Sequence, residues 1–358
     1  MRTIPEPLRR VLDLARWAPS GDNTQPWRFE ILGDAHVCVH GLDTRDHVVY
    51  DLDGHASQLA VGALLETLVV AASVEGHRVE LTRRPDTPDD HLLIDAHFTP
   101  DPAVVPDPLA SVVREQVVQR RAMSTRALTP GQKQRLEHAL PTGYRVRWFE
   151  RFAERAQLAR LMFDNAKVRL TIPEAHAVHR DIIEWGARYS PDRIPEEAVG
   201  VDRLTARLMR WALASWARVE FLNKWLLGDL APRVQLDLVP GFACAAHFTL
   251  HAPAPLATVD DYLAAGRALQ RFWLTAAQAG LFVQPEMTPV IFARYHRERR
   301  AFTARADAQA RVARLSARLA VLAADADVAA LYFIGRIGSG PKPISRSLRR
   351  PLDELLVG

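Results

Sequence analysis

The 358-residue sequence has little cysteine, little lysine and no long uninterrupted apolar run. Its two cysteines, Cys38 and Cys244, are far apart and form no Cys-x-x-Cys pair, so by themselves they define neither a disulfide scaffold nor a metal site. The longest apolar stretch, around residues 68–73, has a glutamate on either side, and the first ten residues contain no apolar signal region. We therefore expect a cytoplasmic protein that does not cross a membrane.

Lysine occurs only four times, so 42 of the 46 basic residues are arginine. The net charge of +4 could suggest a nucleic-acid partner. However, arginines such as Arg311, Arg314 and Arg318 are spaced along the polar face of an expected helix, and no basic run is interleaved with aromatic residues. We therefore expect no nucleic-acid partner. With 48% apolar residues, the composition is that of a globular protein, and at roughly 150 residues per domain the length predicts about two domains.

The first hundred residues predict a compact unit of helices and strands. Apolar residues at helical spacing between Leu8 and Ala15 predict a helix that ends before Pro19, and a polar loop follows as far as Pro26. Strands are expected at 27–32 and 36–40, then a central apolar helix at 62–75, and further strands at 78–82 and 92–98.

A similar order begins again after a proline-rich connector at 100–108. We expect a helix at 111–119, a basic stretch at 120–126, a helix from Pro130 and a strand at 144–149. Gly62 and Gly76 bracket the first apolar helix, and Gly266 and Gly280, also 14 residues apart, bracket a second at 267–279. The sequence therefore predicts two degenerate repeats, residues 1–105 and 106–358.

The second repeat is longer by about 82 residues, because the offset between matching positions grows from 122 to 204. We place this insertion at about 180–258, where four of the eight tryptophans lie: Trp185, Trp211, Trp216 and Trp225. Tryptophans at helical spacing are typical of packing, and a lid over a site is the alternative.

Two polar segments could bind a ligand. Arg120, Arg121, Ser124 and Arg126 offer guanidinium groups and a hydroxyl suited to a phosphate, although an exposed basic turn has the same composition. In the loop at 19–26, Ser, Asn and Gln side chains could reach the edges of a planar polar ring, or could form a polar turn.

Other possible sites are weaker. The glycines at 335–340 have the spacing of a dinucleotide loop, but Pro341 and Pro343 replace the helix that would bind a pyrophosphate, which favours a basic tail folded onto an anion. A polar helix face is favoured over a metal site at 174–181, where the polar residues are Glu174, His176, His179 and Asp181. No Walker, G-x-S-x-G or H-E-x-x-H sequence occurs.

The segment Ala-Pro-Ser-Gly-Asp-Asn-Thr-Gln-Pro-Trp-Arg-Phe at 18–29 resembles the signature loop of the FMN-dependent nitroreductase superfamily. Arg-Arg-x-x-Ser-x-Arg at 120–126 is similar to a stretched form of that family's phosphate-binding Arg-x-Ser-x-Arg element. The segment at 279–285 and the tail at 336–352 are similar to its later blocks. The resemblance covers most of the chain outside the insertion.

The resemblance implies an α+β, nitroreductase-like fold with a mixed, mostly antiparallel sheet in each half. Ordinary members are homodimers in which one subunit's basic element and its partner's loop reach the same flavin. Here the basic element precedes only the second repeat, and the intact loop follows only the first. The resemblance therefore implies an intrachain pseudo-dimer with one FMN, similar to the tandem, single-chain Acg-like subgroup, with the insertion as a helical lid.

The resemblance also assigns cofactor-binding residues. It implies phosphate contacts from the basic element and the tail, where the register is ambiguous, and flavin contacts from the loop and the segment near 285. The residues are Arg120, Arg121, Ser124, Arg126, Arg346, Arg349 and Arg350 for the phosphate, and Pro19, Ser20, Asn23, Gln25, Pro285 and Glu286 for the flavin. No catalytic acid or base is assigned, because the cofactor carries the redox chemistry.

The implied function is an FMN-dependent oxidoreductase that transfers electrons from NADPH, NADH or another donor to an electron-poor organic small molecule. The alternative is an FMN-binding or storage protein with little nicotinamide-dependent activity. We expect a monomer containing the pseudo-dimer, with further oligomerisation compatible with this arrangement.

Overall fold

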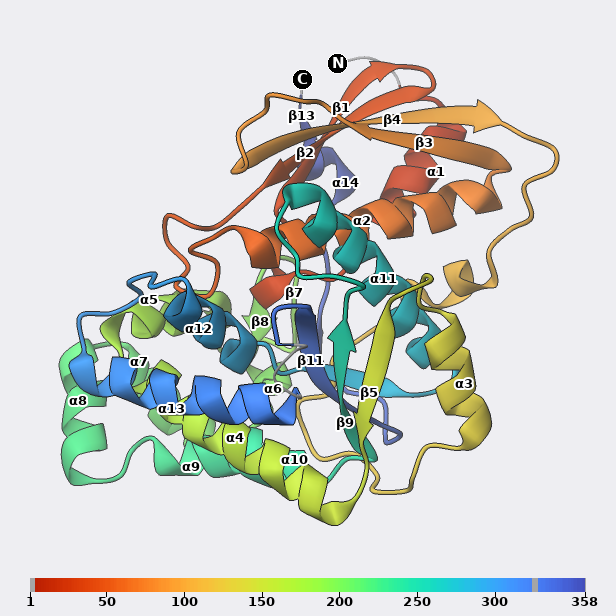
Figure 1. Cartoon of the computed structure of the whole chain (residues 1–358). Helices are drawn as coiled ribbons and strands as arrows, with labels where there is room; N and C mark the ends of the chain where they lie inside the picture. Colours follow the sequence, from red (N-terminus) through yellow and green to blue (C-terminus); the bar gives the residue numbers. More distant parts are fainter. Residues whose placement is uncertain (1–3, 324–327, 358) are drawn as a thin grey trace.

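The computed structural model of the chain describes residues 4–323 and 328–357. The first sheet has the strand order β13-β1-β2-β4-β3, and all neighbours are antiparallel except β13, which pairs in parallel with β1. Its strands are β1 (Trp27–Gly33), β2 (His36–Leu42), β3 (His77–Arg83), β4 (His91–Pro100) and β13 (Leu356–Val357). The four strands predicted in this region are confirmed to within two residues at each end. A strand from the end of the chain thus completes the sheet formed near its start (Figure 1).

The second sheet is antiparallel throughout and has the order β10-β11-β9-β5. Its strands are β5 (Arg145–Phe149), β9 (Ala246–His251), β10 (Phe282–Pro285) and β11 (Leu331–Gly338). In each sheet the first two strands along the chain are neighbours, and the fourth strand lies between the second and the third. The spatial order is β1-β2-β4-β3 in the first sheet and β5-β9-β11-β10 in the second. This mixture of helices and antiparallel sheets confirms the predicted α+β class.

Two long helices cross between the sheets (Figure 1): α2 (His55–Val74) and α11 (Val259–Gln278). A Cβ added at Gly62 would meet the carbonyl oxygen of Leu263, and one added at Gly266 would meet that of Leu59. The contact is therefore reciprocal, and both glycines are needed for the close approach of the helices. By length and composition α2 could cross a membrane, but 89% of its most apolar window is buried in the protein, as expected of a core helix.

Both central helices begin earlier than the sequence predicts, because side chains cap their first turns. The carboxylate of Asp51 accepts hydrogen bonds from the backbone N–H groups of Ala56 and Ser57 at the start of α2. Thr258 and Asp261 form a capping box at the start of α11. These caps lie seven or more residues before the apolar segments that identify the helices.

The helix predicted at 111–119 is wrong. A 3-10 turn at Pro108–Val112 is followed by extended chain, and Val118 forms a parallel bridge to Val283 of β10. The carbonyls of Arg114 and Gln116 accept hydrogen bonds from Arg346 in the tail. Contacts with distant segments therefore replace the local helical hydrogen bonds.

The remaining helices surround these elements. Those outside the insertion are α1 (Glu6–Ala15), α3 (Pro130–His138), α4 (Phe152–Leu170), α5 (Pro173–Ile182), α12 (Thr288–Arg297), α13 (Ala306–Leu322) and α14 (Leu352–Leu355). The predicted insertion at about 180–258 contains short strands and helices: β6 (Ile183–Glu184), β7 (Tyr189–Ser190), β8 (Ile194–Pro195), α6 (Glu196–Val199), α7 (Arg203–Leu213), α8 (Trp216–Trp225), α9 (Leu230–Arg233), a π-helical turn (Val234–Leu238) and α10 (Val239–Phe242). Its predicted end is wrong, because β9 lies within this range and belongs to the second sheet. In the tail, β12 (Arg346–Ser347) pairs with β7.

The cores of the two halves share residues. Leu352 and Leu355, from the end of the chain, are buried with α1, α2 and the first sheet. Val48 and Val49, from the first half, are buried against helices of the second. Neither half therefore has a core made only of its own residues.

Candidate functional site

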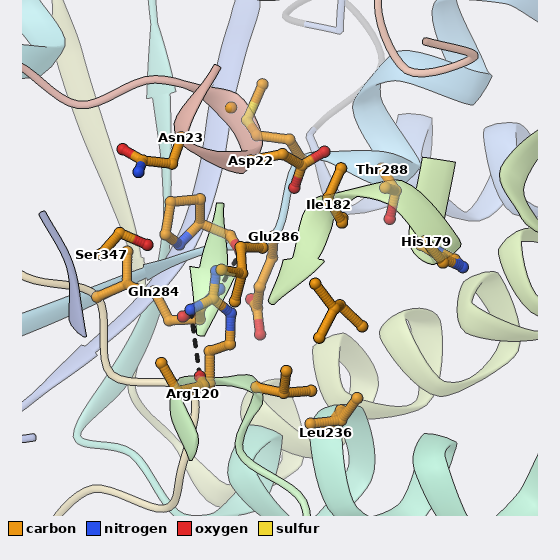
Figure 2. Close-up of a pocket in the computed structure, with 18 of the residues that line it drawn as sticks. Asp22, Asn23, Arg120, His179, Ile182, Leu236, Gln284, Glu286, Thr288 and Ser347 are labelled. Carbon is orange, nitrogen blue, oxygen red and sulfur yellow. Dashed lines mark hydrogen bonds between the residues drawn. The ribbon is translucent and has the colours of Figure 1, made fainter. Parts of the chain in front are cut away.

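A cavity of about 720 Å³ lies where the two halves, the tail and the insertion meet. This volume is within the range of about 300–1,000 Å³ that small-molecule and cofactor sites occupy. In Figure 2, Asn23, Gln284 and Ser347 lie on one side of the cavity, and Ile182, Leu236 and His179 lie on the other. Segments distant in sequence therefore form one site with two unlike walls.

The loop after α1 contributes Pro19, Ser20 and Asn23 to the lining. Asp22, Asn23 and Gln25 have left-handed backbone conformations, with φ values of 49°, 64° and 49°. Such strained conformations are held by surrounding contacts and are concentrated at functional sites. Here the Ser20 hydroxyl accepts a hydrogen bond from the backbone N–H of Gln25 at 3.0 Å.

Gln25 does not line the cavity, but its hydrogen bonds hold the loop in place. Its buried amide donates to the carbonyl of Pro191 in the insertion at 2.8 Å and accepts from the backbone N–H of Arg350 at 2.9 Å. Gln25 thus connects the loop to the insertion and to the tail.

Arg120 and Arg121 line the cavity after the connector. Their guanidinium groups donate to the carbonyls of Ala198 and Glu197, both at 3.3 Å. Ser124 and Arg126 lie elsewhere: both are exposed, and the Ser124 hydroxyl accepts a hydrogen bond from the backbone of Arg126 at 3.2 Å. Of the four residues of the basic element, the structure brings two to the cavity.

In the tail, Arg346 and Arg349 line the cavity, whereas Arg350 lies outside it and forms an ion pair with Asp192 at 3.0 Å. The Arg349 guanidinium donates to the carbonyl of Ala18 and to the side-chain oxygen of Asn23, both at 2.9 Å.

The connector and the tail form one side of the cavity, which we call the basic wall. Four of its arginines form no ion pair with a carboxylate among residues 4–323 and 328–357: Arg120, Arg121, Arg346 and Arg349. Burial, together with the guanidinium groups of Arg346 and Arg16, lowers the pKa of Arg349 to about 9. Burial also lowers the pKa of Arg346 and of Arg120. Arg121 is exposed, whereas Arg120, Arg346 and Arg349 are partly buried. A cluster of guanidinium groups bonded only to neutral oxygens is suited to binding an anion.

Three buried charged groups lie beside this wall. The carboxylate of Glu286 is 2.7 Å from Nδ1 of His247 and 3.5 Å from Nε of Arg336. Nε2 of His247 is 2.8 Å from the carbonyl oxygen of Gly241, so both ring nitrogens face acceptors and the imidazole is doubly protonated. Burial alone would lower the pKa of His247, but the charge of Glu286 outweighs it and raises the pKa to about 10.

Arg336 connects these charges to the basic segment. Its guanidinium donates to the backbone carbonyls of Arg120 at 2.7 Å and Arg121 at 3.1 Å. Arg336 therefore positions the segment that carries two of the cavity arginines.

The opposite wall is apolar or neutral. Aliphatic side chains from the insertion, including Met209, Leu213 and Leu236, line it, and none of the insertion's four tryptophans does. Arg169 pairs with Asp237 at 2.9 Å, so its charge is compensated.

A neutral hydrogen-bonded pair completes this wall. The Tyr50 hydroxyl lies 2.9 Å from Nε2 of His179. Burial lowers the pKa of His179 to about 3, with Arg169 and His176 adding to the effect, and burial raises the pKa of Tyr50. Both side chains are therefore uncharged near neutral pH.

Sequence reasoning did not assign Arg336, Gln284 or the pair of Tyr50 and His179 to the site. Arg336 stands out as a single charge within the otherwise apolar strand 331–338, a pattern that is typical of a buried, partnered cation. Gln284 precedes the assigned Pro285, and its side-chain oxygen is buried without a hydrogen-bond partner among the described atoms. No local pattern marks Tyr50 and His179, which lie 129 residues apart.

The fold and site together define an α+β protein with a ligand-sized cavity lined by residues from both halves of the chain and with a basic wall from the second half. No protein-family model matches the chain. The "Uncharacterized protein MT1398" of Mycobacterium tuberculosis is 26% identical over 304 residues, which are 80% of this chain and 39% of that protein.

Two relatives from the same species carry functional names. "Putative NAD(P)H nitroreductase acg" is 33% identical over 95 residues, 26% of this chain and 28% of its own. "Putative NAD(P)H nitroreductase Rv3131" is 33% identical over 123 residues, 33% of this chain and 35% of its own. The matched regions thus span well under half of each relative. These partial similarities support a distant relationship to the nitroreductase superfamily.

Proposed function

We propose that this chain is an FMN-dependent oxidoreductase that passes electrons from a nicotinamide or another donor to an electron-poor organic molecule. One observation carries the proposal: arginines without carboxylate partners among the described residues meet the loop at 19–24 and β10 in a single ligand-sized cavity. The names of the partial relatives, which are NAD(P)H nitroreductases, support the same class of reaction.

The chemistry of the lining fits FMN. A phosphate monoester carries about two negative charges near neutral pH, and the guanidinium groups of Arg120, Arg121, Arg346 and Arg349 would compensate them. A flavin ring also carries an N–H donor, and the unpartnered side-chain oxygen of Gln284 is an acceptor of the matching kind.

When bound, FMN supplies the redox chemistry, and the protein supplies binding, orientation and electrostatics. In this proposal the basic wall holds the phosphate, while Pro19, Ser20 and Asn23 border the ring from the first half and Pro285 and Glu286 from the second. The aliphatic residues of the insertion exclude water from the opposite side. No side-chain acid or base is assigned to the reaction.

We also propose that residues 1–105 and 106–358 are duplicated units that form an intrachain pseudo-dimer of the Acg-like kind, with the part of the predicted insertion that precedes β9, residues 180–245, as a lid. The equal strand order of the two sheets and the reciprocal contact of Gly62 and Gly266 support a duplication. The lining residues from the insertion support the lid. We also propose that the protein is cytoplasmic and monomeric.

The experiment is to purify the chain, record its absorption spectrum, and then add NADPH or NADH without oxygen. We expect a yellow protein with one FMN per chain, whose flavin band bleaches with at least one nicotinamide and returns on addition of a quinone or nitroaromatic acceptor. A colourless protein that cannot be reconstituted with FMN would contradict the proposal.

A second candidate, an FMN-binding or storage protein, is favoured by the aliphatic residues that the predicted insertion adds to the cavity lining. In that case the flavin band would persist with both nicotinamides and bleach only with dithionite, a small reductant. The same experiment therefore separates the two functions.

A further inference from the structure

A second group of chemically reactive side chains lies outside the cavity lining, on the first sheet. Val37 and Val39 of β2 are buried in the core, so the alternating residues His36, Cys38 and His40 face the other side of the sheet. Cys38 and His40, two residues apart on one strand, therefore share a face.

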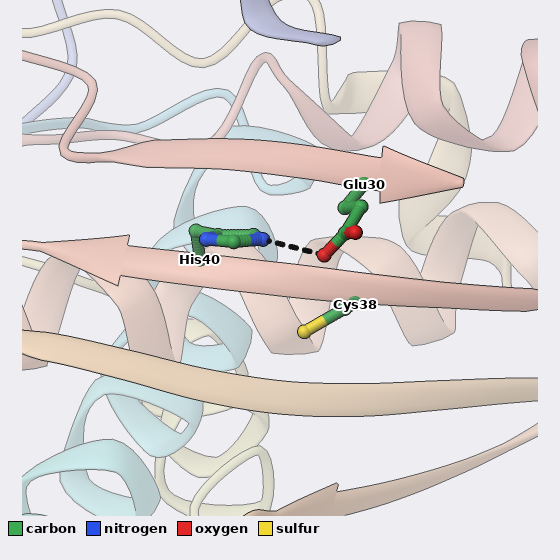
Figure 3. Close-up of side chains that lie close together, drawn as sticks. All are labelled: Glu30, Cys38 and His40. Atoms are coloured by element: carbon green, nitrogen blue, oxygen red, sulfur yellow. Dashed lines mark hydrogen bonds and ion pairs between the residues drawn. The ribbon is translucent and has the colours of Figure 1, made fainter. Parts of the chain in front are cut away.

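The register of the sheet brings a carboxylate to the same place. Glu30 of β1 is the direct cross-strand partner of Cys38. Such partners have Cβ atoms about 4.5–5.5 Å apart. Nε2 of His40 is 3.0 Å from the Glu30 carboxylate, and Figure 3 shows the imidazole facing that carboxylate with Cys38 beside them.

We propose that Glu30, Cys38 and His40 form a binding site for a divalent transition-metal ion, of which Zn²⁺ fits best. One ligand atom from each of the three residues lies within 4.8 Å of the other two. Ligand atoms around a tetrahedral zinc ion, at bonds of about 2.0–2.3 Å, are about 3.3–3.8 Å apart. Small side-chain rotations would therefore bring the three atoms to bonding distance.

The types of ligand determine the choice of ion. Thiolate, imidazole and carboxylate together suit zinc, whereas magnesium and calcium prefer oxygen ligands alone. Three protein ligands leave the fourth position of a tetrahedral ion open to water or another small ligand.

A further contact supports the histidine as a ligand. Nδ1 of His40 lies 2.9 Å from Nε2 of His91 on β4. A histidine that binds a metal through Nε2 usually donates its other N–H to a nearby acceptor, which fixes the tautomer and the orientation of the ring. His91 provides that acceptor.

Cys38 is fully buried beneath this face. Burial raises the pKa of its thiol, with Arg84 opposing the effect and Asp95 and Glu30 adding to it. The thiol is therefore protonated without an ion, and binding of a metal releases its proton to solvent.

Cobalt(II) tests this site because its spectrum reports a bound thiolate directly. The full chain, with any affinity tag removed and treated with a chelator, is titrated with Co²⁺. We expect one equivalent to give a thiolate-to-cobalt charge-transfer band, and Zn²⁺ to displace it. Cys38→Ser should abolish the band, and Glu30→Gln and His40→Ala should weaken binding at least about tenfold.

Two variants serve as matched controls. Cys244→Ser removes the other buried cysteine, and His36→Ala removes a histidine from the same sheet face, where it pairs with Asp95 instead. Both should retain the band, and zinc should raise the thermal unfolding midpoint of these variants and of the unmodified chain but not of Cys38→Ser. Absence of cobalt binding, or a spectrum that Cys38→Ser leaves unchanged, would overturn the proposal. His91→Ala should keep the band with affinity about 10- to 100-fold lower.

Discussion

The two walls of the cavity differ in whether their charged side chains are paired. On the wall formed by the connector and the tail, Arg120, Arg346 and Arg349 donate to neutral oxygens, and none has a carboxylate partner in the described chain. On the insertion wall, Arg169 is paired with Asp237, and Tyr50 and His179 form a neutral pair. The first wall can therefore compensate an added anion, whereas the second is suited to an uncharged molecule.

The largest effect, a loss of stability, is expected when one of the buried charges beside the basic wall is removed. Arg336→Leu would leave Glu286 buried with only His247 to compensate it and would free the carbonyls of Arg120 and Arg121. Breaking a buried ion pair costs about 3–5 kcal/mol, and we expect a loss of that size in the free energy of unfolding. Denaturant unfolding of the flavin-free protein measures it.

The control for this loss is an ion pair on the surface. Arg9 pairs with Asp353 at 3.0 Å with both side chains exposed, and Arg9→Ala should change the free energy of unfolding by less than about 1 kcal/mol. Equal effects of the two substitutions would contradict the role given to Arg336.

The cavity arginines themselves should control binding of FMN. Arg120→Ala removes a cavity-lining cation, and Arg126→Ala removes an exposed one from the same segment. Loss of a partner from a buried charge pair costs about 2–5 kcal/mol, on the order of 30- to 4,000-fold in affinity. We expect a weakening in that range for Arg120→Ala and almost none for Arg126→Ala, measured by flavin fluorescence during titration. Equal weakening would indicate that phosphate contact extends to the exposed part of the element.

The pH dependence of stability tests the protonated state of His247. Its folded pKa of about 10 lies above the ordinary value of 6.5. A raised folded pKa stabilises the folded state fully below the unfolded pKa, and this contribution is lost as pH rises through the folded one. The free energy of unfolding should therefore fall between about pH 6.5 and 10. His247→Asn should remove this part of the slope. A slope that is the same in both proteins would show that His247 is neutral.

The smallest effect on stability and on FMN affinity is expected from a substitution in the neutral wall. Tyr50→Phe removes the hydroxyl that bonds to His179 but leaves every charge in place. Loss of such a bond lowers stability by about 1 kcal/mol, and we expect the affinity for FMN to stay within about threefold. A large loss of FMN in Tyr50→Phe would contradict the division of the cavity into two walls.

The sequence predicted local elements well and contacts between distant elements less completely. Strands β1 to β4 and the apolar parts of α2 and α11 are visible in their hydrophobic patterns. The extended path at 111–119 is not, because it depends on Arg346 and Val283, which are far away in the chain. The same reason explains the site: a motif indicates Arg120 and Arg126 equally, but only the folded chain distinguishes the arginine that lines the cavity from the one that is exposed elsewhere.

The central claim is that one chain builds one FMN site from both of its halves. Titration of the flavin-free protein with FMN, with Asn23→Ala from the first half and Arg120→Ala from the second as variants, tests it directly. The account predicts one FMN per chain, with weaker binding in both variants. A second FMN per chain, or a loss confined to one of the two variants, would contradict it.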